Sequence, residues 1–500
     1  MYNFIIQLVC AAILGVALTF GFSPYDSFCT LLISVTGFIS LLRYFFKVSA
    51  YRKFSTGVYI KAFAIGYVYG FAHFCSSLYW IANALRIDEG LYGWLIPVAI
   101  CAIPAVMAVF TAFFAIVLVW VMDVLFVCKE GRYSVCREVV TFGRACLFAF
   151  LSGILWVACE LLRSYLILPF PWQILGYASA YSIEMMQLAH YISVYGISFI
   201  IIFVCTLISI RTRASVSFAI LICIVVYAAG YYRLQLGGDD VHSGISVRLV
   251  QSNFYPNSDS HYISKLEKIQ RVAQISDIDN DDGSVDYVIW AEAMLDLQQY
   301  DGSTTAYSSS LLDYASSLLK GKALLSGAIL CDVATERSYN SIVLLNGGGI
   351  TSRYDKRILV PFGEYVPFYD ILSVIPVASV FGQFAFATGD SNQNNFTLTG
   401  NDGSKVRLAP LICYEAIFPF PYFRNNLHNA DVIVNLTNDA WFGESIGPWQ
   451  HMQMARMRAI EYGIPMLRVA NGGISAHIDS KGRLIQSISF GKDGYIDATV

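Results

Sequence analysis

Charge is what this 500-residue chain lacks most. Charged residues make up 14% of the sequence, against roughly 25% in an ordinary soluble protein, whereas hydrophobic residues make up 56%. This balance excludes intrinsic disorder, which requires low hydrophobicity and high net charge. Because 33 Lys and Arg face 36 Asp and Glu, the chain has no positive excess to neutralise a phosphate backbone, and nucleic acid is not expected as a partner. The mean hydropathy of +0.55 indicates instead that part of the chain lies in lipid.

Metal-binding cysteine patterns are also missing. The sequence has 12 Cys, but no CxxC pair and no Cys/His spacing typical of a zinc site. All except Cys331 and Cys413 lie in the first half, where Cys behaves as a small apolar residue. A disulfide between these two is conceivable in an oxidising compartment, although the role considered below for Cys413 argues against it. The pattern gives no reason to expect a metal or another cofactor.

Long apolar runs fill the first half of the chain. Crossing about 30 Å of hydrocarbon takes about 20 residues of helix, and seven runs before residue 235 are long enough. We expect the longest run, which contains Pro97 and Pro104, to form one kinked helix; a short re-entrant piece followed by a helix is the alternative. Since a second span follows the first almost at once, we interpret the first as a retained helix rather than a signal peptide. The predicted spans are 4–21, 27–46, 58–82, 91–121, 145–165, 185–209 and 214–232.

Positive residues alternate between the loops of this half. They cluster after the second span, between the fourth and fifth, and between the sixth and seventh, whereas loops 22–26 and 166–184 have none. Because loops rich in Lys and Arg stay cytoplasmic, the N-terminus is predicted inside. Seven crossings then place the remainder of the chain on the outer side. The clustered residues are Arg43, Lys47, Arg52, Lys53, Lys129, Arg132, Arg137, Arg144, Arg211 and Arg213.

The composition changes at Gly237–Asp240, which predicts a boundary between a membrane domain (1–235) and a second domain (241–500). Beyond it, short runs rich in Val, Ile and Leu alternate with amphipathic stretches, as in an α/β domain with covered sheets. Gly347–Gly349 is typical of a hairpin turn. The predicted strands are 245–252, 286–291, 323–330, 340–346, 405–412, 431–436 and 466–470, and the predicted helices are 262–278, 305–320 and 449–462.

Three residues with useful chemistry lie near the ends of predicted strands. Cys413 and Glu292 each directly follow a strand, and Lys356 lies in a charged, aromatic loop. If they converge, the carboxylate can take a proton from the thiol and the ammonium can stabilise oxyanions during acyl transfer. Backbone N–H groups that follow a nucleophile at a strand end can also stabilise the oxyanion by hydrogen bonding. Taken singly, each residue also fits a structural role: a packed thiol, a solvated rim residue or a structural ion pair.

Seven motifs extend this pattern along the chain. They are FSPYD (22–26), WVACELLRS (156–164), PFPWQILGYA (169–178), WAEA (290–293), YDKRILVPFGEYVPF (354–368), APLICYEAIFP (409–419) and NDAWFGESIGPWQHMQMARMRAIEYGIPMLRVANGGISAHID (438–479). Together they resemble the apolipoprotein N-acyltransferase family, the membrane-bound branch of the nitrilase, or carbon–nitrogen hydrolase, superfamily. The resemblance extends over nearly all of the chain.

The resemblance implies a polytopic α-helical membrane domain followed by a nitrilase-like αββα sandwich. It implies that Glu292 is the general base and acid, that Lys356 stabilises tetrahedral intermediates, and that Cys413 is the nucleophile. The implied reaction moves an acyl chain from a phospholipid, through a Cys thioester, to the α-amine of the N-terminal diacylglyceryl-cysteine of a lipoprotein, in a ping-pong course. The implied location is the bacterial cytoplasmic (inner) membrane, with the catalytic domain on its extracytoplasmic face, in agreement with the charge pattern.

Further residues are assigned supporting roles. Glu364, Tyr414 and Glu415 match family positions near the nucleophile, and Trp441 is a candidate for the substrate-binding crevice. Core packing is the alternative for each aromatic residue, and we expect His451 to make structural hydrogen bonds rather than to act as a base. Other candidates for an apolar, lipid-facing lining are Phe362, Tyr365, Phe368, Phe442 and the segment 371–387.

The sequence also departs from the family pattern. Ala291 stands where Pro is usual, Gly472 replaces a commoner Asn, and residues 251–262 lack a common Lys-Trp dipeptide. The family usually ends with another transmembrane helix, and none is predicted before Val500. Two other functions remain open at this stage: a membrane-tethered nitrilase-type amidohydrolase, and a catalytically silent transporter or sensor. Few paired charges lie in the apolar runs, which disfavours the transporter.

Overall fold

The structure is a computed structural model of the chain, and its description omits residues 1, 51–55, 87–89, 91–92, 127–140, 167–168, 237–243, 255–263, 279–283, 301, 348, 370–384, 420–422 and 424–426. The chain divides into two compact units. The first, called here the membrane unit, comprises Met1–Leu236 and Glu444–Gln453. The second, called the catalytic unit, comprises Gly237–Gly443 and Met454–Val500.

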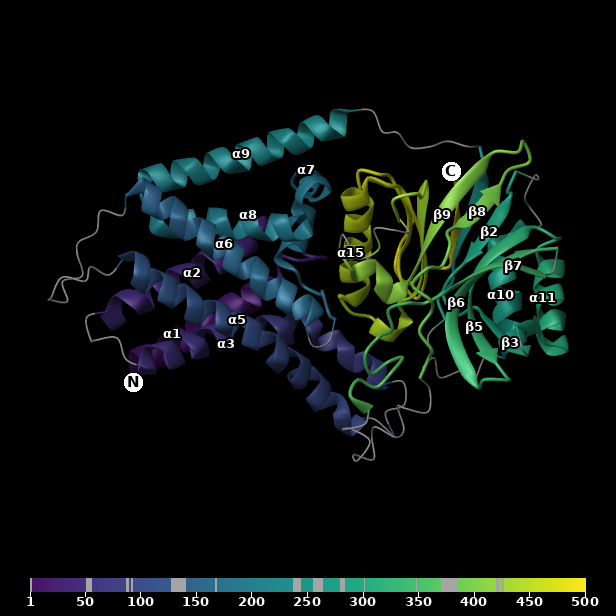
Figure 1. Ribbon diagram of the computed structural model, residues 1–500, viewed down its shortest axis with the longest axis horizontal. Coiled ribbons are helices and arrows are strands. Elements are labelled where there is room, and N and C mark those ends of the chain that lie inside the picture. The colour runs from purple at the N-terminus through teal and green to yellow at the C-terminus, as the bar shows by residue number, and fades with distance from the viewer. Residues whose placement is uncertain are drawn as a thin grey trace. The chain divides into compact units, whose positions relative to one another are not determined.

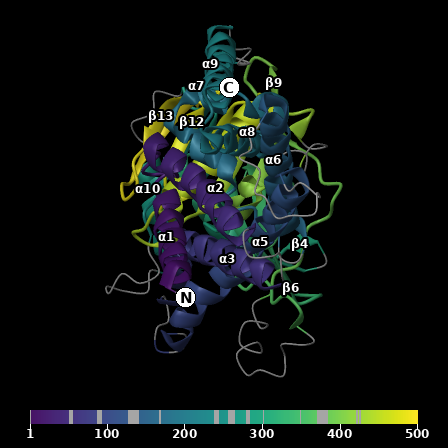
Figure 2. The ribbon, with the colours of Figure 1, turned by 90° about the vertical axis from the view of Figure 1, so that its left-hand side faces the viewer.

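The membrane unit is a bundle of apolar helices (Figures 1 and 2). Within the described residues, six helices are long and apolar enough to cross a membrane. Helix α1 (Tyr2–Thr19) corresponds to the first predicted span; its apolar stretch is shorter than the other six, so a seventh crossing stays a prediction. The six are α2 (Phe28–Ala50), α3 (Thr56–Leu78), α5 (Ile96–Phe126), α6 (Phe142–Tyr165), α8 (Ala189–Ile210) and α9 (Arg213–Gln235).

Two of the predicted spans differ in detail from the helices. The run at 91–121 forms the short η2 (Gly93–Leu95) and then α5, one 31-residue helix with Pro104 inside it, which confirms one helix rather than two. The run at 185–209 is divided instead. The short α7 (Ile183–Met186) precedes α8, and Ser193 breaks the helical geometry of α8 with a φ of 59°.

Small residues bring the helices of this bundle close together. A Cβ on Gly70 of α3 would lie 1.9 Å from the Thr111 hydroxyl of α5, and one on Gly15 of α1 would lie 2.2 Å from the Tyr69 carbonyl. In lipid, helices gain little from hydrophobic contact with each other, so close packing at such small residues stabilises the bundle. Some of the sequence predictions fall wholly or partly outside the described residues: Arg52, Lys53, Lys129, Arg132, Arg137, the boundary at Gly237–Asp240, and most of 251–262 and 371–387.

The catalytic unit contains two β-sheets. The first has eight strands in the order β14-β1-β2-β5-β3-β4, with β6 and β7 added beside β5. The second has six strands in the order β13-β12-β11-β10-β9-β8. The strands are β1 (Ser246–Gln251), β2 (Tyr287–Trp290), β3 (Leu295–Tyr300), β4 (Ser303–Thr304), β5 (Ala323–Asp332), β6 (Arg337–Asn346), β7 (Gly349–Asp355), β8 (Phe396–Thr399), β9 (Lys405–Ile412), β10 (Val432–Asn438), β11 (Met466–Asn471), β12 (Ser475–Ile478), β13 (Leu484–Ile488) and β14 (Gly494–Thr499).

The two sheets enclose one apolar core. Side chains of β1, β2 and β5 from the first sheet pack with side chains of β9, β10 and β11 from the second. Helices α10 (Lys265–Ser276) and α11 (Ala306–Leu318) cover the first sheet, and the part of α15 (Gly447–Tyr462) after Gln453 belongs to the second side of the sandwich (Figure 1). The unit is therefore an αββα sandwich, the fold that the sequence resemblance implies.

All seven predicted strands and all three predicted helices are present. The Gly347–Gly349 hairpin is confirmed, because β6 and β7 pair antiparallel with Asn346 opposite Gly349. The sequence patterns did not predict the remaining strands, which are β3, β4, β7, β8, β12, β13 and β14. These strands are short, half-exposed or polar at alternate positions, as in β3, where buried residues alternate with partly or fully exposed ones. They therefore lack the continuous apolar run that marks a buried strand.

Candidate active site

Glu292 lies immediately after β2, at the point where a buried strand ends in a tight turn. The turn places Ala293 at a φ of 54° and packs against Gly327 of β5. A Cβ on Gly327 would lie 2.4 Å from the Glu292 Cα, so only glycine fits there. Two backbone hydrogen bonds hold the turn against β5. The Gly327 N–H donates to the Ala291 carbonyl (3.1 Å), and the Met294 N–H donates to the Gly327 carbonyl (2.9 Å). The position of the carboxylate is therefore set by backbone packing.

The Glu292 carboxylate joins the two sheets. One oxygen accepts a hydrogen bond from the Asn438 N–H at the end of β10 (2.6 Å), and the other accepts from Asn340 Nδ2 of β6 (2.8 Å). Burial raises the pKa of Glu292, against the opposing effect of the Lys356 ammonium. A carboxyl group whose pKa is raised toward neutrality suits a residue that takes up a proton and returns it.

Lys356 follows β7 and is almost completely buried, with 1% exposure. Its ammonium donates to Glu364 Oε1 (2.8 Å) and lies 3.6 Å from Glu292 Oε1. Burial alone would lower the pKa of Lys356, but the carboxylates of Glu364 and Glu292 outweigh it and raise that pKa. The residue therefore carries its positive charge at neutral pH, as a group that stabilises oxyanions must.

Asn340 and Glu364 complete this charged cluster. Asn340 Nδ2 also donates to Glu364 Oε1 (2.9 Å), and the second oxygen of Glu364 accepts from the Val360 N–H (2.8 Å). Each carboxylate thus has a fixed orientation toward Lys356. Asn340 was not among the residues predicted for the site, although its place as the polar first residue of a predicted apolar strand is a usable signal.

Cys413 begins the short helix η5 (Cys413–Ile417) directly after β9. Its φ of 47° lies in the left-handed region that non-glycine residues rarely adopt and that often occurs at functional sites. Burial, and then the negative charge of Glu292, raise the pKa of Cys413, while Lys356 opposes the shift and the Thr437 side chain forms a hydrogen bond that favours the thiolate. The thiol is therefore protonated at neutral pH, and it needs a base to accept its proton during attack.

Glu415 anchors the turn that carries Cys413. It is fully buried, and its carboxylate accepts from the N–H groups of Ile412 (2.8 Å) and Arg357 (2.7 Å) and from the Tyr354 hydroxyl (3.0 Å). The bond to Arg357 N–H ties this turn to the residue after Lys356. Glu415 therefore holds the Cys413 turn and the segment after β7 together. Tyr354 is a further residue that the sequence patterns did not single out.

Tyr414 and Trp441 have different environments. Tyr414 is buried and packs edge-on against Phe418, with ring centroids 5.3 Å apart, which is a core role. Trp441 lies in η6 (Ala440–Phe442), and 47% of its surface is exposed. Trp441 follows closely in sequence after the end of β10, where the Asn438 N–H binds Glu292. Because its side chain is exposed, Trp441 is available for contact with a substrate.

The turn beside Trp441 rests on a buried ion pair. Asp439 accepts from Arg468 (2.7 Å) with both side chains fully buried, and also from the Thr437 hydroxyl (2.8 Å). Gly472 has a φ of +59°, and a Cβ there would lie 2.8 Å from Ala440 Cα. Glycine adopts this left-handed conformation without strain and brings no Cβ into that contact, so Gly472 fits the close approach to Ala440.

The remaining sequence candidates are placed as follows. Phe362 (43% exposed) and Phe368 (58% exposed) lie on the surface, and the Phe362 N–H donates to the Tyr365 carbonyl (2.7 Å). His451 is buried in the membrane unit and packs against Trp172, with ring centroids 5.7 Å apart. Ala291 is fully buried.

Cys331 and Cys413 are both free thiols. Across the described part of the chain, no group of three His, Cys, Asp or Glu residues is arranged to hold a metal ion.

Comparison with known proteins identifies two family models along the chain. One, described as carbon-nitrogen hydrolase, matches residues 247–500, and one described as apolipoprotein N-acyltransferase N-terminal domain matches residues 14–207. An apolipoprotein N-acyltransferase from Allorhizobium ampelinum is 34% identical over 463 residues, covering 90% of this chain and 81% of that protein. One from Rickettsia bellii is 32% identical over 453 residues, covering 88% of this chain and 83% of that protein.

A solved structure is also similar to the chain. The crystal structure of a CN-hydrolase superfamily protein from Xanthomonas campestris covers 51% of this chain and 90% of its own, with 17% sequence identity and a TM-score of 0.35. The two family models and the curated relatives together show an N-acyltransferase of the carbon–nitrogen hydrolase superfamily, built as a multi-pass membrane protein. The chain belongs to the apolipoprotein N-acyltransferase family.

Proposed function

We propose that this protein transfers an acyl chain from a phospholipid to the α-amine of the N-terminal diacylglyceryl-cysteine of lipoproteins. The convergence of Glu292, Lys356 and Cys413 carries the proposal. Three residues from separate strands form one electrostatic cluster, in which the Lys356 ammonium lies 3.6 Å from Glu292 and both charges act on the Cys413 thiol. A carboxylate, an ammonium and a thiol are sufficient for acyl transfer without a metal.

In the first half-reaction, Glu292 accepts the thiol proton as the Cys413 sulfur attacks the ester carbonyl carbon. Lys356 stabilises the negative oxygen of the tetrahedral intermediate. The intermediate collapses to a thioester, and Glu292 returns the proton to the departing alkoxide, which leaves as lysophospholipid. This sequence explains why the pKa of Glu292 is raised, since the same carboxyl must both accept and donate a proton.

In the second half-reaction, the lipoprotein amine attacks the thioester carbonyl. Glu292 takes a proton from the amine, the amide forms, and the sulfur regains a proton as Cys413 is released. The thioester keeps the acyl group activated, and conversion to an amide is downhill. Because the lysophospholipid leaves before the amine reacts, a ping-pong course follows. Trp441 and Phe362, both exposed, are proposed to contact the acyl chains.

The proposed location of the catalytic unit is the extracytoplasmic face of the bacterial inner membrane. Two side-chain contacts support the alternating arrangement of helices that this requires. Arg43, near the end of α2, donates to the Ser209 carbonyl at the end of α8, and Lys61, near the start of α3, lies over the Phe4 ring of α1. Positive residues at these helix ends mark the cytoplasmic side.

Labelling of an introduced surface cysteine in intact spheroplasts tests this orientation, and labelling only after lysis would refute it.

Mass spectrometry of the purified protein after incubation with phospholipid tests the reaction. We expect a mass increase of one acyl chain on Cys413, which a diacylated lipopeptide then removes as it becomes N-acylated. The matched control is Cys413→Ser, which should show neither change. Rapid release of free fatty acid without any peptide acceptor would contradict the transferase and favour the membrane-tethered amidohydrolase.

A further inference from the structure

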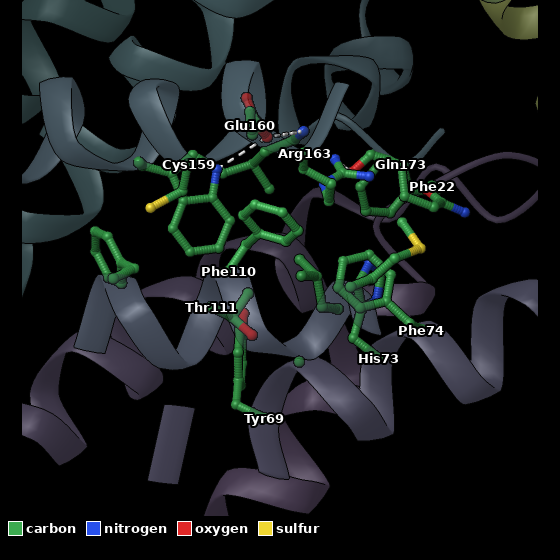
Figure 3. Close-up of a pocket in the computed structure, with 16 residues that line it drawn as sticks. Phe22, Tyr69, His73, Phe74, Phe110, Thr111, Cys159, Glu160, Arg163 and Gln173 are labelled. Atoms are coloured by element: carbon green, nitrogen blue, oxygen red, sulfur yellow. Dashed lines mark hydrogen bonds between the residues drawn. The ribbon is translucent and has the colours of Figure 1, made fainter. Parts of the chain in front are cut away.

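A second buried acid and base lie in the membrane unit. Glu160 and Arg163 are one turn apart on α6, and each is less than 10% exposed. Together with His73, Phe110 and Thr111 they line a small cavity inside the helix bundle (Figure 3). Buried ionisable residues within membrane helices are expensive to maintain and are therefore candidates for function.

Both side chains bind the backbone of one loop that follows α6. The Arg163 guanidinium donates to the carbonyls of Phe170 (3.4 Å), Trp172 (2.5 Å) and Gln173 (3.3 Å). Glu160 Oε1 accepts from the Leu175 N–H at the other end of the loop (2.7 Å). The loop Phe170–Leu175 is thus fastened at both ends to the same turn of α6, and it includes Gln173 at an unusual φ of 54°.

The fastened loop presents the Trp172 indole to Gln450. Trp172 Nε1 donates to Gln450 Oε1 (2.9 Å), and Trp80 Nε1 donates to the same oxygen (3.2 Å). The two indole rings lie 4.8 Å apart, and Gln450 Nε2 donates back to the Ser77 carbonyl (3.3 Å). We call this arrangement of Trp80, Trp172 and Gln450 the indole clamp.

Gln450 belongs to a segment with an unusual place in the chain. Residues 247–500 match the carbon–nitrogen hydrolase family, yet Glu444–Gln453 packs within the membrane unit. The chain on both sides belongs to the catalytic unit: Trp441 comes just before the segment, and the rest of α15, including the buried Arg458 and Ile460, comes just after. Trp441 lies nine residues before Gln450 on the same peptide, and α15, which begins at Gly447, continues from the one unit into the other.

We propose that Glu160 and Arg163 are positioning residues for the acyl transfer. They fix the Phe170–Leu175 loop, the loop holds the indole clamp on Gln450, and the clamp sets the start of α15 and the adjacent Trp441 turn. The inference rests on the proposed function, because Trp441 is there assigned to substrate contact. A misplacement of about 1 Å in such a turn is sufficient to reduce a reaction rate about 100-fold.

Four variants and one matched control test the positioning role in the full-length protein. Arg163→Lys removes the forked donor, Glu160→Gln removes the charge, Trp172→Phe removes one indole N–H, and Gln450→Leu removes the shared acceptor. The control, Trp120→Phe, changes a Trp on α5 that is 54% exposed. The measurements are kcat and KM for N-acylation of a diacylated lipopeptide, and the Tm in detergent.

We expect kcat to fall about 10-fold or more in Trp172→Phe and Gln450→Leu while the Tm changes by only a few degrees. Trp120→Phe should match the unmodified protein. Combining Arg163→Lys with Gln450→Leu should reduce kcat no further than the worse single change, because both act through one chain of contacts. If Arg163→Lys does not fold, Trp172→Phe combined with Gln450→Leu gives the same test.

Two results would overturn the positioning role. One is an unchanged kcat in folded Trp172→Phe and Gln450→Leu proteins, and the other is a double variant whose loss is the product of the single losses. Failure of the proposed function is distinct from both, because then the unmodified protein itself would transfer no acyl chain to the lipopeptide.

Discussion

The protein buries two Glu–base pairs, one in each unit, and they differ in what the cation binds. In the catalytic unit, Lys356 contacts only carboxylates among its described hydrogen bonds and ion pairs, those of Glu364 and Glu292. In the membrane unit, Arg163 donates to three backbone carbonyls of one loop. A compact ammonium beside a thiol can turn toward a developing oxyanion, whereas a planar guanidinium shared among carbonyls is committed to holding backbone.

The comparison shows that burial and charge by themselves do not identify a catalytic pair. Both acids are buried, and both lie close to a base. What separates them is the neighbour: the charge of Glu292 raises the pKa of the Cys413 thiol, whereas Glu160 binds the Leu175 N–H and the Trp156 indole (2.9 Å). A titratable pair is a candidate for chemistry where it adjoins a nucleophile, and a candidate for positioning where it adjoins a loop.

Replacing the proposed nucleophile should have the largest effect. Cys413→Ser removes the thiol that is proposed to form the thioester, and we expect N-acyl transfer to fall by at least about 10³-fold. Assay of lipopeptide N-acylation with the purified variant provides the measurement. The protein should remain folded and inserted, since Ser is nearly isosteric with Cys. Retained transfer by this variant would refute the assignment of Cys413 and remove the basis for separating the two pairs.

Removing the ammonium of the catalytic pair should have the next largest effect. Lys356→Met leaves Glu292 and Glu364 buried without their cation, so we expect transfer to fall about 10²- to 10³-fold and the free energy of unfolding to drop by about 3–5 kcal/mol. Initial-rate kinetics and thermal unfolding measure the two effects. Lys405→Met, at an exposed position of β9, is the control and should change neither. Equal activity of the two variants would exclude Lys356 from oxyanion stabilisation.

A change next to the Glu292 backbone should test how precisely the Glu292 carboxylate must be positioned. Gly327→Ala introduces a Cβ 2.4 Å from the Glu292 Cα, and the turn must shift to accommodate it. We expect activity to fall about 100-fold, because misplacement of a reacting group by about 1 Å costs that much. Gly349→Ala, where a Cβ meets no atom within 4 Å, is the matched control. Normal activity in Gly327→Ala would show that the catalytic pair tolerates movement.

The smallest expected effect is on the reactivity of the Cys413 thiol when Glu292 is replaced. The alkylation rate of the thiol should rise, although acyl transfer is lost. The negative charge of Glu292 is, after burial, a cause of the raised pKa of Cys413. Glu292→Gln removes that charge, so the pKa of Cys413 should fall and the thiolate fraction near pH 9 should rise. We expect alkylation of Cys413 by iodoacetamide to become several-fold faster while acyl transfer is lost.

Peptide mapping after timed alkylation across pH 7–10 measures this change at Cys413 alone. Glu267→Gln, on the exposed first turn of α10, is the control and should leave the alkylation rate unchanged. Slower alkylation in Glu292→Gln would mean that Glu292 promotes the resting thiolate, and the mechanism in which it accepts the proton only during attack would then be wrong.

Much of the site could be predicted because its residues lie at strand ends. Glu292 and Cys413 each interrupt an apolar run, and that interruption is visible in the sequence. Asn340 and Tyr354 were missed, although they bind Glu292 and Glu415, because their partners are 48 and 61 residues away. The polar Asn340 at the start of a predicted strand marks a candidate, but a hydrogen bond between distant residues leaves no local pattern, so only the folded chain reveals the partner.

The sequence by itself determined the two-part plan of this protein: apolar runs long enough to cross a membrane, a second half with β-rich periodicity, and the three residues proposed for chemistry. Local composition decides these features, because the length of an apolar run and the spacing of apolar side chains act over neighbouring residues. The tertiary structure decided that Lys356 lies between two carboxylates and that Gln450 packs in the membrane unit. Both depend on contacts between residues far apart in the chain, and such contacts form only when the whole fold closes.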